Sequence, residues 1–170
     1  MDKLQYLILI SLLFPILLLP TQAEDITVRQ LSANKKLGEI AQAAYDWAGQ
    51  AIEDGNVSGL RQLLNDSPNL ARASIYDKEH DATRSLLHVA TDWPSHFPNI
   101  SETISLLTTA GSDVNAGIKG ADTETPLHWA ASSNDVAEID ALMDGSASID
   151  AIGAVIAGGD PLEDAIGFQS

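Results

Sequence analysis

Two short segments of this chain repeat one another at a spacing of 40 residues. Residues 84–90 read RSLLHVA and residues 124–130 read ETPLHWA, so His88 and His128 hold the same place in each. Residues 106–116 (LLTTAGSDVNA) and 141–151 (ALMDGSASIDA) also align, each with an apolar pair before small residues. Repeats with a period of roughly 20 to 50 residues predict a stack of similar supersecondary units.

The second copy contains local signals for two helices joined by a short turn. Thr125 suits the capping position of the first helix, and Pro126 suits the position after it, where a missing N–H costs nothing. Residues 133–135 (Ser-Asn-Asp) end that helix and cap the next. The apolar face of the second helix is then expected to hold Val136, Ile139, Leu142 and Met143.

The chain before the repeats is also helical in pattern. Leu37, Ile40, Ala44, Trp47 and Ile52 recur near one face of a helix that ends at Gly55. A second short helix is expected after Asn56, with an apolar face formed by Val57, Leu60, Leu63 and Leu64.

The repeated segments resemble the ankyrin repeat family. TPLHWAA at residues 125–131 is similar to the family's T-P-L-H-x-A signature, and GSDVNA at residues 111–116 is similar to the turn after its second helix. The resemblance implies an all-α fold, an ankyrin-repeat solenoid of stacked helix-turn-helix units with short β-turn loops. It further implies that His88 and His128 tie one repeat to the next, within a structural signature of Leu87, His88, Thr125, Pro126, Leu127 and His128.

The departures from the family pattern define the predicted organisation. Residues 37–73 lack the signature and are expected to form a degenerate cap, followed by repeats at 83–116 and 123–151 and a half-repeat at 158–170. Within residues 91–99 (TDWPSHFPN), the first repeat carries an insertion of about five residues between its helices.

The N-terminus predicts export from the cytoplasm. One lysine is followed by an apolar run from Leu7 to Leu19 and by the small residues of Thr21-Gln22-Ala23. This pattern is typical of a signal peptide over residues 1–23, and the run is short for a membrane anchor or span. Residues 24–36 are expected to be a flexible lead-in. The mature protein is then periplasmic or secreted.

Composition narrows the classes of partner and chemistry. The formal net charge is −15, which disfavours nucleic acid and anionic membranes and favours a protein partner with a basic patch. The chain has no cysteine, so disulfides, thiol catalysis and thiolate metal sites are excluded. No cofactor is predicted.

The insertion is the first candidate for binding a partner. It places Trp93, His96 and Phe97 in a proline-containing loop, where aromatic side chains either anchor a partner or fold back onto the neighbouring repeat. Trp129 presents the same two alternatives. The loop at residues 117–124 adds Lys119 and Asp122, either as partner contacts or as solvated residues.

These features predict a non-enzymatic scaffold that binds a protein through the concave face and loops of the solenoid. One alternative is a hydrolase or metal-dependent enzyme that uses His80, His88 and His96. Another is a structural protein that self-associates through its C-terminal half-repeat.

Overall fold

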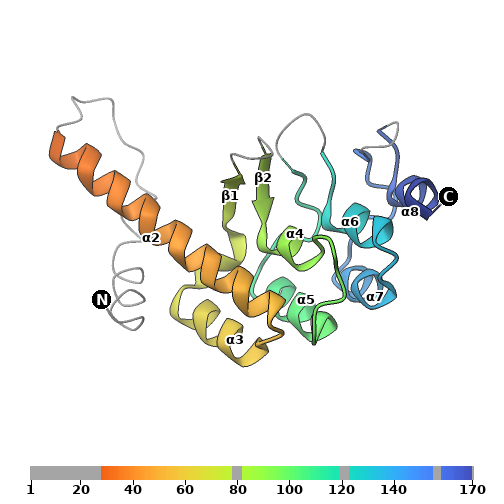
Figure 1. The fold of residues 1–170 in the computed structure, drawn as a ribbon, viewed down its shortest axis with the longest axis horizontal. Coiled ribbons are helices and arrows are strands. Elements are labelled where there is room, and N and C mark those ends of the chain that lie inside the picture. The colour runs from red at the N-terminus through yellow and green to blue at the C-terminus, as the bar shows by residue number, and fades with distance from the viewer. Residues whose placement is uncertain (1–27, 78–81, 119–122, 155–157, 170) are drawn as a thin grey trace.

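The computed structural model describes residues 28–77, 82–118, 123–154 and 158–169, which are mostly helical (Figure 1). The strands β1 (Ser74–Asp77) and β2 (Ala82–Ser85) pair antiparallel in a two-stranded sheet. The helices are α2 (Val28–Glu53), α3 (Val57–Asp66), the 3-10 helix η2 (Pro68–Arg72), α4 (Leu86–Ala90), α5 (Ile100–Thr109), α6 (Pro126–Ser132), α7 (Val136–Asp144) and α8 (Pro161–Gln169).

The helices lie in two rows, and successive pairs pack side by side along the molecule. The C-terminal part of α2 is followed by α4, α6 and α8 in one row, while α3, α5 and α7 form the other (Figure 1). The hairpin β1–β2 projects from the first row. The core lies between the two rows, and its largest fully buried apolar side chains are Ile52, Leu60, Leu86, Leu87, Ile104, Leu107 and Leu142.

The helix α2 begins at Val28, nine residues before the predicted start at Leu37. Residues 28–36 of the predicted lead-in over residues 24–36 are therefore helical. Those residues contain no glycine and no proline, so nothing in them ends a helix. The missing apolar periodicity, on which the prediction rested, marks only the part of a helix that packs on a core.

The junction between α2 and α3 is fixed by one capping residue and one glycine. The Asn56 side chain accepts a hydrogen bond from the backbone N–H of Gly59 at 2.9 Å and caps α3. Gly55 has φ +63° and lies against Pro98, so close that a Cβ at residue 55 would stand 2.5 Å from the Pro98 carbonyl oxygen. A glycine is required at this position for both reasons.

The two paired strands β1 and β2 are not among the elements that the sequence predicted. Ile75 pairs with Arg84 and Tyr76 with Thr83 in the antiparallel register. The β-branched and aromatic residues of these two strands favour extended backbone.

The buried face of α7 differs from the predicted one. Val136 is 62% exposed and Met143 is 39% exposed, so the prediction that both line the core is wrong. Glu138 and Leu142, one helical turn apart, are fully buried instead. Val136 precedes Glu138 by two positions, or about 200° around the helix, and therefore faces away from the core.

The predicted signal peptide at residues 1–23 lies outside the described residues. Among the residues that the structure does describe, no helix combines the length and apolar character that crossing a bilayer requires.

Candidate protein-binding surface

His128 joins the start of α6 to the backbone that precedes α8. Its Nδ1 accepts the backbone N–H of Thr125 at 3.0 Å, and its Nε2 lies 3.3 Å from the carbonyl oxygen of Gly159. Because Nδ1 accepts a backbone N–H, the ring proton is on Nε2, which donates to the carbonyl. The ring is fully buried, beside the buried side chains of Pro126 and Leu127.

His88 makes the equivalent contacts one repeat earlier. Its Nδ1 accepts the backbone N–H of Ser85 at 3.3 Å, and its Nε2 lies 3.1 Å from the carbonyl oxygen of Glu124. Burial lowers the pKa of His88 to about 4, with the nearby charges of Arg84 and His128 acting in the same direction. The hydrogen bond to Glu124 opposes this shift but does not overcome it, so the ring is neutral near pH 7.

The three histidines of the enzyme alternative do not form a group that the structure describes. His80 lies outside the described residues, and both ring nitrogens of His88 bond to the backbone of the fold. His96 is on the loop after α4 and pairs with Asp135. Within residues 28–77, 82–118, 123–154 and 158–169, no three His, Asp or Glu side chains are arranged to hold a metal ion.

The insertion loop (residues 91–99) separates its two aromatic side chains. Trp93 is 83% exposed, the largest exposed fraction among the large apolar residues described. Phe97 is half-buried and packs against the hydrophobic core. Phe97 therefore folds back and packs, which is one of the two alternatives for this loop, whereas Trp93 presents its indole to solvent.

The insertion loop is attached to α2 at one end. The side-chain amide of Asn99 donates to the carbonyl oxygen of Gly55 at 3.0 Å, where Pro98 also meets Gly55. Asn99 precedes α5 with φ +57° and makes no side-chain cap of its own helix.

The middle of the insertion loop is attached to the start of α7. Ser95 Oγ donates to Oε1 of Glu138 at 2.9 Å, and Nδ1 of His96 donates to Oδ2 of Asp135 at 2.5 Å. Ser95 and His96 have φ values of 64° and 60°, a left-handed backbone that costs energy for residues other than glycine. These side-chain bonds to α7 hold the strained turn in place and fix the position of Trp93.

Two buried carboxyl groups receive these bonds, and their environments differ. Burial, together with the neighbouring Asp135 carboxylate, raises the pKa of Glu138 to about 7 against the opposing bonds from the Ser95 hydroxyl and the His96 backbone. Burial also acts to raise the pKa of Asp135, but hydrogen bonds from the Glu138 backbone and from His96 outweigh it and the pKa is lowered. Near pH 7, Asp135 therefore carries the charge, while Glu138 is about half protonated.

Ser95 and Glu138 are not among the site residues predicted from the sequence, and Asp135 was predicted only to cap a helix. Asp135 does cap α7, because its Oδ1 accepts the backbone N–H groups of Ala137 and Glu138 at 2.9 and 3.1 Å. When Ile104 of α5 is aligned with Ile139 of α7, Glu138 takes the position that Thr103 holds in α5. Thr103 is also a buried polar residue.

Trp129 packs between repeats. Its ring stands edge-on to His88, with centroids 5.2 Å apart, and its Nε1 donates to Oε2 of Glu124 at 2.8 Å. Trp129 is half-buried, so less of its ring is available to a partner than that of Trp93. The other predicted contacts, Lys119 and Asp122, lie outside the described residues.

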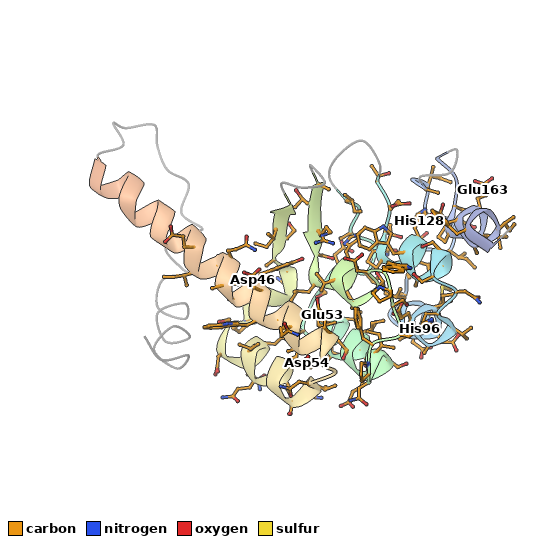
Figure 2. The ribbon with its side chains drawn as sticks, viewed as in Figure 1. Asp46, Glu53, Asp54, His96, His128 and Glu163 are labelled. Carbon is orange, nitrogen blue, oxygen red and sulfur yellow. The ribbon has the colours of Figure 1, made fainter. Side chains whose placement is uncertain are left out.

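Two further surface features accompany the insertion loop. A groove of about 420 Å³ lies between the hairpin β1–β2 and residues 111–117, and its lining includes Arg72, Ser74, Thr83, Asp113 and Asn115. At the other end of the molecule, α8 exposes Leu162, Ile166 and Phe168 by 63%, 62% and 58%. Figure 2 shows Glu163 on this helix, above His96 in the view.

Comparison with known proteins places the family resemblance on one helix pair. Residues 122–151 match the family model of the ankyrin repeat, which covers α6, α7 and the turn between them. No curated protein matches the chain significantly. The match supports an ankyrin repeat protein, a class that typically serves as a non-enzymatic module for protein–protein interaction.

Proposed function

We propose that this protein is a non-enzymatic ankyrin scaffold, a solenoid that binds a protein partner through the insertion loop and the adjoining concave face. The observation that carries this proposal is Trp93, which is 83% exposed on a loop whose backbone is fixed by side-chain bonds. An exposed indole in a preorganised loop buries a large area on binding while losing little conformational entropy. The groove beside β1–β2 provides a second contact area on the hairpin side.

The charge distribution supports a partner with a basic patch. Residues 85–170 contain 13 acidic residues and one basic residue, Lys119, so most of the net charge of −15 belongs to the repeats. Four of these acidic residues, Glu124, Asp135, Glu138 and Asp164, are buried. Those that are exposed accelerate encounter with a basic partner and disfavour anionic ones. The association rate with such a partner is expected to fall about tenfold or more between low and physiological salt.

We place the protein in the periplasm or outside the cell, since its first 23 residues have the charged, apolar and small-residue pattern of a signal peptide. N-terminal sequencing of the exported protein tests this assignment. A mature chain that begins at Glu24 agrees with it, and an intact Met1 contradicts it.

Affinity capture from the native compartment tests the binding proposal. Wild type and Trp93→Ala serve as baits, with Phe168→Ala as the matched control because it also removes an exposed aromatic ring. Wild type and Phe168→Ala are expected to retain the same protein, and Trp93→Ala to lose at least 90% of it, because an aromatic anchor contributes about 2 kcal/mol or more. Equal capture by all three baits contradicts a role for Trp93.

Self-association through α8 is a second candidate, which we propose because Leu162 and Ile166 lie one turn apart and are both more than 60% exposed. Sedimentation velocity of the full chain tests it. A dimer that Ile166→Asp converts to a monomer agrees with the proposal, and a monomer at all concentrations contradicts it.

A further inference from the structure

The bonds between the insertion loop and α7 depend on groups that gain and lose protons. Four side chains make the connection: Ser95, His96, Asp135 and Glu138. Three of them are nearly inaccessible to water, with exposed fractions of 6% for Ser95, 4% for Asp135 and 0% for Glu138. Two carboxyl groups are therefore held together under a lid that consists of the loop itself.

We propose that these four residues form a pH-sensitive latch, which holds the insertion loop on α7 in acid solution and releases it as the solution passes through neutrality and becomes alkaline. The proposal rests on the proposed function in one respect, because the loop that the latch controls is the one that presents Trp93. It concerns the regulation of that surface and not the identity of the partner.

The geometry of Glu138 makes the latch sensitive to its ionisation. Oε1 accepts the Ser95 hydroxyl, whereas Oε2 is buried and has no hydrogen-bond partner among the described residues. A protonated carboxyl group tolerates this environment, but a carboxylate requires donors or water at both oxygens. Water reaches Glu138 when Ser95, which lies over it, moves away.

The charged groups around Glu138 do not stabilise its carboxylate form. Asp135, on the same helix, adds a like charge, and His96 from the loop is already bonded to Asp135. The one charged residue of α5, Glu102, is exposed and pairs with Arg61 at 3.5 Å. The one titratable residue of α6, His128, directs both ring nitrogens to the backbone of Thr125 and Gly159.

The loop is the element that moves when Glu138 ionises. The bonds from Ser95 and His96 favour the Glu138 carboxylate but do not outweigh the cost of burying its charge. Opening the loop exposes the carboxylate to water, and the left-handed backbone of Ser95 and His96 then relaxes. The far end of the loop stays attached through Asn99 and Gly55. Release therefore swings the segment that carries Trp93 without unfolding the helices on either side.

Fluorine NMR of the full chain labelled with 5-fluorotryptophan tests the latch. The three tryptophans give three resonances, and Trp93→Phe assigns that of Trp93. Between pH 5 and pH 9 the Trp93 resonance is expected to shift in one step centred near pH 7. Corrected for intrinsic rates, amide hydrogen exchange at Ser95 and His96 is expected to accelerate about tenfold above the step, as for a local opening.

Variants separate the latch from a general effect of pH. In Glu138→Gln the step is expected to disappear, because glutamine stays neutral and still accepts the Ser95 hydroxyl. In Glu163→Gln, which removes an exposed carboxyl group on α8, the step is expected to remain. A wild-type Trp93 resonance without a step overturns the proposal, as does a step that persists unchanged in Glu138→Gln.

A measurement on wild type covers the case in which Glu138→Gln fails to fold. With ¹³C-labelled glutamate, the Glu138 carboxyl carbon is expected to titrate with the same midpoint as the Trp93 step, and different midpoints overturn the latch. Neither readout needs a partner. The latch can therefore fail while capture through Trp93 succeeds, and it can hold even if capture fails.

Discussion

At the scale of single residues, the two equivalent histidines act through hydrogen bonds rather than through chemistry. His88 and His128 use one ring nitrogen for their own helix and the other for backbone 36 and 31 residues further along the chain. Each ring thus satisfies a backbone N–H and a backbone carbonyl that belong to neighbouring units. Residues that satisfy buried polar groups in this way are costly to replace.

Replacing His128 with alanine tests this role. The change leaves the N–H of Thr125 and the carbonyl of Gly159 without their side-chain partner and opens a cavity, so we expect a loss of about 2 to 4 kcal/mol in the free energy of unfolding. Urea denaturation measures it. Trp93→Phe, at an exposed position, is expected to change stability by less than about 0.5 kcal/mol. A similarly small effect at His128 contradicts the assignment.

The lowered pKa of His88 predicts a dependence of stability on acid. The folded state binds fewer protons than the unfolded state between about pH 6.5 and pH 4, so His88 contributes stability that is lost as the pH falls through this range. The loss reaches about 3 kcal/mol below pH 4. The raised pKa of Glu138 has the opposite effect, because it increases the stability of the folded state as the pH falls from about 7 to about 4.5. The pH dependence of wild type therefore reports only the difference between the two effects.

Comparison of two variants separates the contributions of His88 and Glu138 to the pH dependence of stability. Unfolding free energies of Glu138→Gln are expected to fall on acidification from pH 6.5, and those of His88→Gln to fall as the pH rises from 4.5 to 7. Where His88→Gln does not fold, the pH dependence of Glu138→Gln and an NMR titration of the His88 ring in wild type replace it. A ring that titrates near 6.5 contradicts this account.

At the scale of elements, the predictions that succeeded rest on local chemistry. The helices α6 and α7 follow from Thr125, Pro126 and Asp135, whose effects act within one turn of the chain. The early start of α2 and the hairpin β1–β2 depend on residues without a periodic apolar pattern, so the sequence did not indicate them. The contact between Ser95 and Glu138 joins residues 43 apart through a left-handed turn, and no pattern of spacing encodes such a contact.

The cap of α7 gives a test at this scale. Asp135→Ala removes the acceptor for the N–H groups of Ala137 and Glu138 and is expected to cost about 1 to 2 kcal/mol. Asp135→Asn keeps an acceptor oxygen at the same position and is expected to recover at least half of that loss. Equal destabilisation by both variants assigns the effect to the negative charge beside His96 and not to the cap. Thermal unfolding followed by circular dichroism distinguishes these outcomes.

At the scale of the whole molecule, successive helix pairs pack into two rows, and the proposed binding function rests on the exposed features of the loops between them. The ordered core lies between the two rows of helices, while Trp93 and the groove beside β1–β2 face solvent. The net negative charge is concentrated from residue 85 onward because that part of the chain has a single basic residue, Lys119, and it also contains the match to the ankyrin repeat. The proposal of a basic protein partner therefore rests on the same half of the chain as the family match.

Photo-crosslinking in the native compartment tests this central claim most directly. A photoreactive amino acid at position 136 lies next to the insertion loop, because Val136 follows Asp135 and is 62% exposed, and leaves Trp93 intact. We predict a crosslink to another protein that disappears when Trp93→Ala is added and is absent from a control probe at Ile149, which is 60% exposed. Crosslinks that are equal at both positions, or that do not depend on Trp93, would contradict the account.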